Sequence, residues 1–512
     1  MKNKLVIAHD LGTSGNKAVL VSSEGNIVAS SFSGYETFYP KSGWAEQNPQ
    51  DWWNAVRNST IDLLEKVPYV KKSIVSISFS GQMMGCIPVD KNGKHLCRAI
   101  IWSDQRAFKQ REILSKLVSD GDSYKITGTI MIANYLAAKI LWLKDNYNEI
   151  YKKTYKFLQA KDFIVQKLTG EFYSDYSDAS GTNLFDIKRK EWSRDILSTV
   201  GVSIDKLPTL VESTRIVGKM KKDVAEEMGL QAGLPVVIGG GDGPCATVGA
   251  GASRPGTCYN IYGSSSWNSL TTNEPLYDNL RRTFILNHLD PNLYMGVGTM
   301  QSAGASFEWL KKWIYDSEQK ASKKNNVNSY EELSIRAGKA GVGSNGLLFL
   351  PYLMGERSPY WDTEVKGAFL GLTRLTGRNE IVRSVLEGVV YHLKLILEIL
   401  EENSKKISEV RLIGGGGKSK LLQKMMADIW GKPIITMKYM EEATSLGAAI
   451  AGFIGIGVIK DFFEADSILK INDKIYPVEE NTAEYSKYYN IFKQAYNELK
   501  SINHQIDDII KY

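Results

Sequence analysis

The sequence has 512 residues, and a chain of this length usually folds around more than one hydrophobic core, so at least two domains are expected. Its composition, with 43% hydrophobic and 23% charged residues, is typical of a globular protein. The net charge of +6 is small, and no long basic tract with interleaved aromatic residues occurs, which argues against nucleic acid as a partner.

Cysteines, histidines and apolar runs exclude further classes of protein. The four cysteines show no C-x-x-C spacing, which favours a reduced, cytoplasmic protein. The first apolar run is too short for a signal peptide, and residues 446–459 are too few and too rich in glycine to cross a membrane. The five histidines lack metal-ligand spacing, so any divalent metal would bind to oxygen ligands.

In chain order, the N-terminal part begins with strands joined by glycine turns. Strands are expected at residues 4–10, 17–23 and 26–33, followed by a helix over 47–66. Asn48 is placed to cap that helix, with Pro49 at its first position. A strand then runs into the loop "SGQMMG", and residues 105–170 are mostly helical.

The C-terminal part repeats this opening pattern. Residues 234–252 predict a buried strand, a glycine loop and a helix of small residues, and residues 256–272 predict a second hairpin with a Gly-Ser-Ser-Ser turn. A long amphipathic helix over 381–403 and a strand, glycine loop, helix and strand over 409–434 follow. Two halves that each begin with such a hairpin indicate a duplicated α/β core with a cleft, divided into residues 1–247 and 248–512.

The two hairpin turns have the composition of phosphate-binding loops. Gly-Thr-Ser-Gly in the first turn offers backbone N–H groups and the hydroxyls of Thr13 and Ser14, with Lys17 close behind. Asp10, at the end of the preceding strand, can hold Mg²⁺. An ordinary hairpin with a capping aspartate is the alternative. The second turn presents the same donors, from Gly263, Ser264 and Ser265.

Asp242 is the second carboxylate at the end of a buried strand. Carboxylates at such positions in α/β proteins face the ligand crevice. One of the pair can position a metal while the other accepts a proton from an attacking hydroxyl, and Asp242 is the candidate base. A helix N-cap is its structural alternative.

Two further loops have the composition of ligand sites. The four glycines of 414–417, followed by Lys418, let the backbone approach a flat ring or a ribose, although a tight strand-to-helix turn would also use glycine. After strand ends, "SGQMMG" and "IIWSDQRA" combine Gln, Asp and Arg with an aromatic residue, as a sugar site requires. The alternatives there are core methionines and a surface salt bridge, with core packing and ligand contact equally open for Met83 and Met84.

These motifs, taken together, resemble the FGGY carbohydrate kinases, most of all the xylulokinase branch. The resemblance rests on segments that run in family order from the first strand to about residue 455: "AHDLGTSGNKAVL", "GWAEQNPQDWW", "SGQMMG", "IIWSDQRA", "SDASGTNLFD", "GGGDG", "GSSS", "PYLMGERSPYWD", "GAFLGLT", "VLEGVVYHL" and "LIGGGGKSKLLQKMMADIWGKPI". The C-terminal segment "YPVEENTAEYSKYYNIFKQAY" is also similar to the last helix of that family.

The resemblance implies two actin-like, ribonuclease-H-type α/β domains with a catalytic cleft between them. It implies transfer of the γ-phosphoryl group of ATP to the terminal hydroxyl of a ketose, with Mg²⁺ as cofactor and a small-molecule sugar as partner. Since kinases of this family often form dimers, it also suggests a homodimer. By position in the motifs, the resemblance assigns catalysis to Asp242, the metal to Asp10, ATP to Thr13, Ser14, Lys17, Gly263, Ser264, Ser265, Gly415, Gly416 and Lys418, and the sugar to Gln82, Met83, Met84, Trp102, Asp104 and Asp242.

Two departures from the branch fall in the expected sugar pocket. Met84 stands where xylulokinases usually have a histidine that contacts the ketose, and Ser103 replaces an asparagine. Loss of a hydrogen-bond donor from a buried sugar site costs discrimination. D-xylulose, giving D-xylulose 5-phosphate, is the first expectation. Another pentulose or polyol (ribulose, L-xylulose, fuculose, erythritol) and a non-catalytic sugar or nucleotide sensor are the alternatives.

Overall fold

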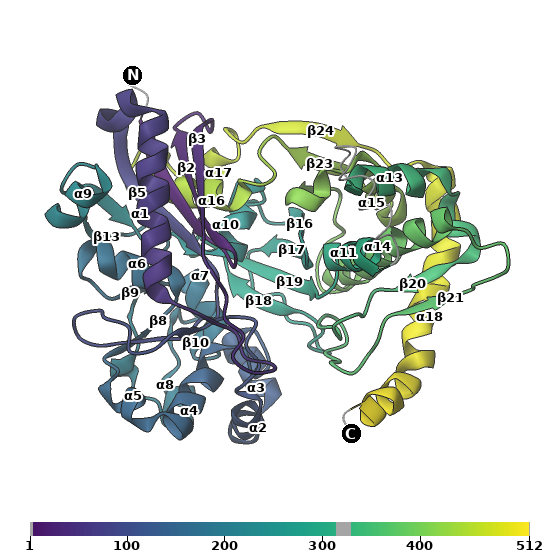
Figure 1. The fold of residues 1–512 in the computed structure, drawn as a ribbon, viewed down its shortest axis with the longest axis horizontal. Coiled ribbons are helices and arrows are strands. Elements are labelled where there is room, and N and C mark those ends of the chain that lie inside the picture. Colours follow the sequence, from purple (N-terminus) through teal and green to yellow (C-terminus); the bar gives the residue numbers. More distant parts are fainter. Residues whose placement is uncertain (1–3, 314–328, 511–512) are drawn as a thin grey trace.

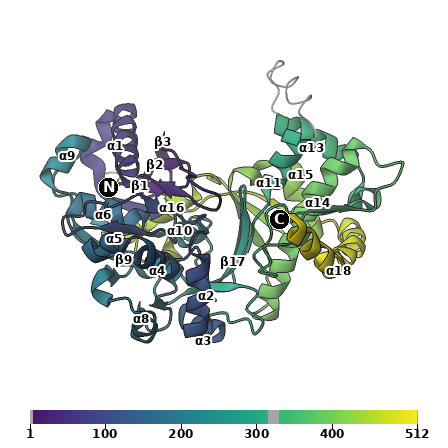
Figure 2. The ribbon, with the colours of Figure 1, turned by 60° about the horizontal axis from the view of Figure 1, so that its bottom comes forward.

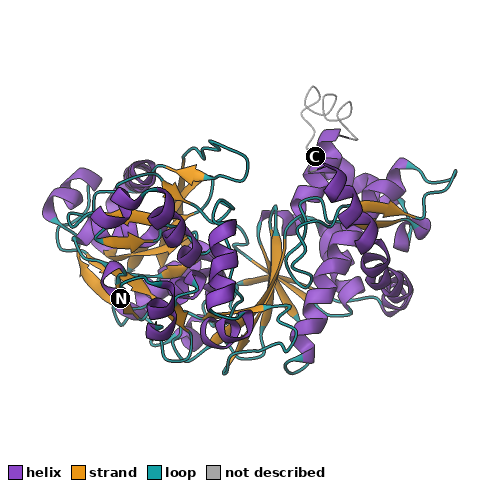
Figure 3. Cartoon of the chain, turned by 90° about the horizontal axis from the view of Figure 1, so that it is seen from below, coloured by secondary structure: helices purple, strands orange, loops and turns teal. Residues whose placement is uncertain are grey.

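Two mixed β-sheets with flanking helices form the two halves of the molecule (Figure 1). The computed structural model describes residues 4–313 and 329–510. Because each half has its own sheet and its own buried apolar cluster, the prediction of a two-domain α/β fold is confirmed. Figures 2 and 3 show the two halves joined at a narrow middle section.

The N-terminal sheet starts with the predicted antiparallel strands. Asp10 ends its buried run beside Ser80, because β1 pairs in parallel with β5. The sheet order is β13-β14-β5-β1-β2-β3, with β15 paired to β5. Its strands are β1 (Leu5–Leu11), β2 (Gly15–Ser22), β3 (Ile27–Gly34), β5 (Ile74–Gly81), β13 (Ile216–Lys219), β14 (Pro235–Val237) and β15 (Gly240–Gly241).

The C-terminal sheet repeats the opening hairpin and the parallel neighbour. Its order is β18-β19-β17-β16-β22-β23-β24, with β16 antiparallel to β17 and parallel to β22. The turn of this second hairpin therefore sits at the same place in its sheet as the first turn does. The strands are β16 (Cys258–Tyr262), β17 (Ser266–Thr272), β18 (Phe284–Asn287), β19 (Tyr294–Met300), β22 (Val410–Ile413), β23 (Ile434–Met437) and β24 (Ile471–Ile475).

Helices cover the sheets and form a lobe on the N-terminal domain. The Asn48 side chain accepts a hydrogen bond from the Gln50 backbone at the start of α1 (Pro49–Lys66), as the Asn-Pro pair predicts. A separate apolar cluster holds the lobe together. The lobe and neighbouring helices are α2 (Phe108–Leu117), α3 (Asp120–Thr127), α4 (Leu136–Asn146), α5 (Asn148–Lys153), α6 (Ala160–Thr169), α7 (Tyr176–Ala179), α8 (Arg194–Val200) and α9 (Lys222–Met228).

The C-terminal core is built around one long helix. Helix α14 (Arg378–Glu402), predicted from its amphipathic pattern, packs on the sheet and against the last helix, α18 (Glu479–Ile510). Short strands β20 (Leu348–Leu350) and β21 (Ala368–Leu370) pair beside it. Other helices of this domain are α11 (Gly304–Trp313), α13 (Ser329–Lys339), α15 (Lys420–Trp430) and α17 (Phe462–Ala465).

The small strands of the N-terminal domain are β4 (Glu46–Gln47), β6 (Ile87–Val89), β7 (Ala99–Ile100), β8 (Lys156–Leu158), β9 (Tyr173–Asp175), β10 (Phe185–Asp186), β11 (Glu191–Trp192) and β12 (Thr209–Val211).

Two helices cross where the domains meet. Helix α10 (Asp242–Gly249) packs against α16 (Ala443–Gly455), and α16 also packs on β1 and β5. A Cβ added to Gly249 would overlap the Ala443 carbonyl, and one added to Gly447 would overlap the Cys245 carbonyl. The backbones therefore touch at this crossing, and only glycine fits at these two positions.

His9, which has no sequence-based explanation, is part of the N-terminal core. Its ring stacks on Phe79 at 5.5 Å, and its nitrogens lie 3.0 Å from Asn16 Nδ2 and 3.3 Å from Thr60 Oγ1. Burial lowers the His9 pKa to about 3, so the ring is neutral.

All four cysteines are free thiols. Across residues 4–313 and 329–510, every helix is too short or too polar to span a bilayer.

Candidate active site

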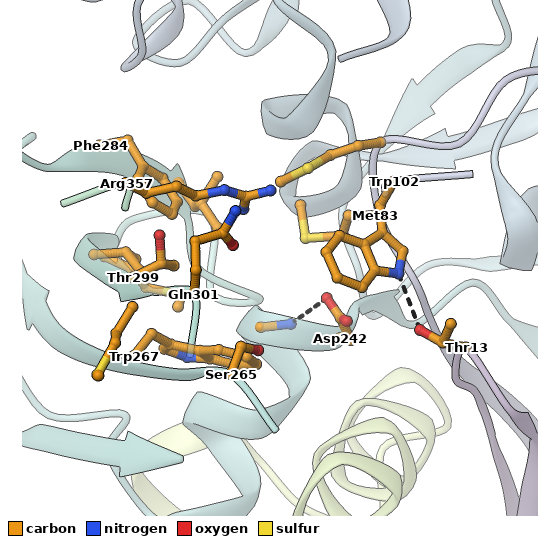
Figure 4. A pocket seen from close by; sticks show the side chains of 16 residues that line it. Thr13, Met83, Trp102, Asp242, Ser265, Trp267, Phe284, Thr299, Gln301 and Arg357 are labelled. Atoms are coloured by element: carbon orange, nitrogen blue, oxygen red, sulfur yellow. Dashed lines mark hydrogen bonds between the residues drawn. The ribbon is translucent and has the colours of Figure 1, made fainter. Parts of the chain in front are cut away.

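A cavity of about 240 Å³ lies between the two domains (Figure 4). The N-terminal domain contributes residues from the first turn, from two loops after strand ends and from the start of α10: Thr13, Met83, Met84, Trp102, Asp242 and Gly243. The C-terminal domain contributes its second turn and strands β17 to β19, with the polar side chains of Ser265, Thr299, Gln301 and Arg357. Both halves of the duplicated core therefore meet at one site.

Asp242 is the carboxylate of this cavity. It opens α10, with Gly241 at the N-cap position, and its Oδ1 accepts a hydrogen bond from the Gly243 backbone at 2.8 Å. Burial, followed by the negative charge of Asp10, raises the Asp242 pKa from 3.8 to about 7. A carboxyl group with this pKa can accept a proton at neutral pH, which an ordinary surface aspartate does poorly.

A buried ionic cluster lies beneath the start of α10. Lys161 Nζ is 2.6 Å from Asp162, 2.9 Å from Asp175 and 3.2 Å from Asp178, and all four side chains are buried. Asp175 also accepts from the Ser177 hydroxyl, which in turn accepts from the Gly241 backbone at 3.1 Å. The cluster thus fixes the residue that precedes Asp242.

The first turn brings a second carboxylate close to Asp242. Ser80 Oγ donates to Asp10 Oδ1 at 3.0 Å, and within the described ranges no hydrogen bond reaches Asp10 Oδ2. Burial raises the Asp10 pKa, and the charge of Lys17 partly opposes this. Thr13 belongs to the same turn, and its Oγ1 accepts a hydrogen bond from Trp102 Nε1 at 2.9 Å, which fixes the threonine at the cavity wall (Figure 4).

A second cavity, of about 870 Å³, opens on the other side of the second turn. Five predicted ATP contacts line it: Gly263, Ser264, Gly415, Gly416 and Lys418. Ser265, next in the chain, lines the first cavity instead, so this turn separates the two spaces. A Cβ on Gly416 would lie 2.5 Å from the Tyr262 ring, which explains why the glycine loop carries no side chain there.

Two predicted ATP residues of the first turn line neither cavity. Ser14 is exposed at the tip of the hairpin. Lys17 Nζ donates to the Glu441 carbonyl at 3.0 Å and lies 3.8 Å from Glu442, so its charge connects the two domains. Phosphate contact for both residues stays a prediction.

Gln82 and Asp104, predicted to contact the sugar, also lie outside the cavity lining. Gln82 Nε2 donates to Gln47 at 2.8 Å and to the Gly12 carbonyl at 3.4 Å, behind the first turn. Asp104 is fully buried and pairs with Arg106 through bonds of 2.7 to 2.9 Å. Both side chains therefore support loops whose neighbours reach the cavity.

The loop "SGQMMG" places both methionines in the cavity wall. Met84 has a positive φ of 66°, its backbone N–H donates to Gln159 at 2.6 Å, and its carbonyl accepts from Lys139 at 2.8 Å. Met83 is almost completely buried, whereas Met84 is partly exposed. The side chains that this loop presents to a ligand in the cavity, those of Met83 and Met84, are therefore apolar.

Sequence reasoning missed most of the polar groups from the C-terminal domain. Arg357 belongs to "GERSPYWD", which the family resemblance places at the C-terminal part of the cleft without a catalytic role, and Gln301 and Thr299 lie near the end of β19. The motif that contains Arg357 was visible, but nothing in the sequence indicated that Arg357, Thr299 and Gln301 lie opposite Asp242.

Comparisons with known proteins agree with this geometry. The N-terminal domain model of the FGGY family of carbohydrate kinases matches residues 5–249, and its C-terminal domain model matches residues 258–456. A xylulose kinase of Staphylococcus xylosus is 32% identical over 96% of this chain and 99% of its own length. A gluconokinase of Bacillus subtilis (strain 168) is 31% identical over 98% of this chain and 97% of its own length. A ligand-bound xylulose kinase structure from Lactobacillus acidophilus superimposes with a TM-score of 0.91 at 27% identity, covering 98% of this chain and 100% of that one.

Proposed function

Since the chain belongs to the FGGY family of carbohydrate kinases, we propose that it transfers the γ-phosphoryl group of ATP to the terminal hydroxyl of an open-chain sugar, with Asp242 as the general base. The observation that carries the proposal is a carboxyl group with a pKa of about 7 in a cavity lined by both hairpin turns. A base of this kind must contact the hydroxyl it activates.

The proposed reaction uses the two cavities together. ATP lies in the larger cavity with its phosphates at the turn of Gly263 to Ser265, and the sugar lies in the smaller one. Asp242 takes the hydroxyl proton as the sugar oxygen bonds to the γ-phosphorus, the bond to the β-phosphate oxygen breaks, and ADP leaves. Backbone N–H groups of the two turns stabilise the charge on the transferred group. Closure of the domains would exclude water.

The carboxyl groups also fit a magnesium ion. Mg²⁺ in such sites usually binds one or two carboxylates together with phosphate oxygens and water. Asp10 has a carboxylate oxygen without a hydrogen bond to the described residues, and Asp10 raises the pKa of Asp242, so a cation there would relieve the repulsion. When bound, Mg²⁺ would supply charge neutralisation for the phosphates.

The acceptor is the open part of the proposal. The xylulose kinases among the relatives make D-xylulose the first candidate, and ribulose, L-xylulose, fuculose and erythritol follow. The gluconokinase of B. subtilis adds a sugar acid as a second candidate. A cytoplasmic location and a homodimer stay predictions.

Coupled ADP release tests the function. The wild-type protein would be assayed with ATP and Mg²⁺ against these sugars, D-gluconate and a no-sugar blank. Asp242→Asn should lower kcat by at least about a hundredfold while ATP binding is kept, because general bases contribute on that scale. Asp290→Asn, in the turn before β19, is the matched control. Near-normal turnover by Asp242→Asn would contradict the assignment, and no sugar-dependent turnover with any acceptor would favour a sensor.

A further inference from the structure

The sugar cavity contains one guanidinium group on its C-terminal side. Arg357 lines the cavity, and its guanidinium carbon lies 6.0 Å from the centre of the Trp102 ring across the domain boundary. Figure 4 shows its side chain reaching over Gln301 into the cavity toward Trp102, with Asp242 on another side of the same space. A sugar bound with one end at Asp242 would thus present its other end to Arg357.

The charge of Arg357 is not compensated by the protein. Within residues 4–313 and 329–510, its side chain makes no hydrogen bond and no ion pair. Its neighbour Glu356 is turned away: Oε1 accepts from the backbones of Gln301 and Arg357 at 2.9 and 2.8 Å, and Oε2 lies 3.5 Å from His392. Burial raises the Glu356 pKa to about 8, so this carboxyl is largely neutral at pH 7.

Two other arginines, whose side chains are almost completely buried, are paired with carboxylates. Arg106 bonds to Asp104 at 2.7 Å and to Glu46 at 2.8 Å, and Arg383 bonds to Glu387 at 2.7 Å. Buried charges in proteins are normally paired in this way, because an isolated charge out of water is costly. Desolvation lowers the Arg357 pKa, and the nearby Tyr135 and Glu356 oppose this only in part, although the residue keeps some exposure to solvent. The missing partner is therefore expected on the ligand.

We propose that Arg357 binds a carboxylate at the end of the acceptor opposite the phosphorylated hydroxyl, so that the preferred acceptor is a sugar acid. The inference rests on the proposed kinase function and, among its candidate acceptors, places the sugar acid before D-xylulose. A planar guanidinium matches a carboxylate in two parallel hydrogen bonds, whereas the hydroxyl groups of a ketose would leave its charge unbalanced. The side-chain amide of Gln301, beside it in the cavity wall, can donate to the same carboxylate.

Matched acceptors isolate the carboxylate. D-gluconate and D-glucitol share their chain and hydroxyl configuration and differ only at C1, which is a carboxylate in one and a hydroxymethyl group in the other. We expect kcat/KM for D-gluconate to exceed that for D-glucitol, and that for D-xylulose, by about tenfold or more, since charge-assisted hydrogen bonds contribute on that scale. D-xylonate and xylitol form a five-carbon pair for the same comparison.

Variants assign the preference to Arg357. Arg357→Gln should raise KM for D-gluconate at least about tenfold and leave KM for neutral acceptors and for ATP within about threefold. Arg357→Lys should keep part of the preference, because the charge remains without the fork geometry. Arg189→Gln is the matched control, since the Arg189 side chain is 70% exposed and lies in the N-terminal domain, outside the cavity lining.

A binding measurement separates this inference from the kinase proposal. Trp102 and Trp267 line the cavity, so D-gluconate titrated without ATP should change tryptophan fluorescence in the wild-type protein and not in Arg357→Gln. If no acceptor is phosphorylated, the kinase proposal fails while this titration still decides the subsite. If neutral sugars are phosphorylated without a preference for acids, or if Arg357→Gln weakens ATP and all acceptors equally, the carboxylate subsite is refuted and the kinase proposal stands.

Discussion

Lowering the pH below neutrality should switch off phosphoryl transfer by protonating Asp242. Burial and the charge of Asp10 raise its pKa from 3.8 to about 7. A raised carboxyl pKa means that the basic form is present above about pH 7 and is lost as the pH falls. About a tenth of the molecules keep the carboxylate at pH 6 and about a hundredth at pH 5, so kcat/KM should fall about tenfold per pH unit.

The assay is ADP release between pH 5 and 9 with the best acceptor, analysed as kcat/KM because that ratio reports the free protein. In Asp10→Asn, removal of the negative charge should move the acid limb to lower pH. Since Asp10 is also the proposed metal ligand, only the position of the limb is compared and not the rate. A profile that stays flat down to pH 5.5 in the wild type would refute either the desolvation of Asp242 or its role as base.

Four substitutions test other parts of the structure. Asn48→Ala should lower the free energy of unfolding by about 1 kcal/mol, measured by denaturant titration, because the cap of α1 is lost. Gly416→Ala should raise KM for ATP and not for the sugar, since a Cβ would press on Tyr262; equal changes in both would contradict the two-cavity assignment. Met84→His should raise kcat/KM for D-xylulose relative to other acceptors by restoring a donor, and an unchanged ratio would show that this position does not select the sugar. Lys161→Met should destabilise the protein by about 3–5 kcal/mol, because three buried aspartates lose their cation; a loss below about 1 kcal/mol would mean that they are already neutral.

Much of the fold could be predicted because its signals are local. Asn48 and Pro49 mark the start of α1, and the glycine turns mark the ends of strands that stand out in the sequence as short apolar runs. The two hairpins could also be recognised as equivalents, because each joins two strands through a short turn of small residues.

The sugar side of the site was harder to predict, because it depends on which neighbour a polar side chain finds. Gln82 and Asp104 are residue types that often bind sugars, yet their side chains already form hydrogen bonds with Gln47 and Arg106. Arg357 shows the reverse, since an arginine beside a glutamate suggests a local ion pair, whereas Glu356 is held by backbone N–H groups. Such partners lie far apart in the sequence, and only the folded chain shows which of them meet.

The glycine crossing of α10 and α16 limits how the cleft can change shape. Because the carbonyls of Ala443 and Cys245 lie against Gly249 and Gly447, the helices can turn about their contact but cannot slide past or approach each other. Asp242 stands at the first residue of α10, one short helix away from that pivot. Because Asp242 lies close to the axis of such a rotation, a swing that moves the outer edges of the two domains by a large amount displaces Asp242 only slightly.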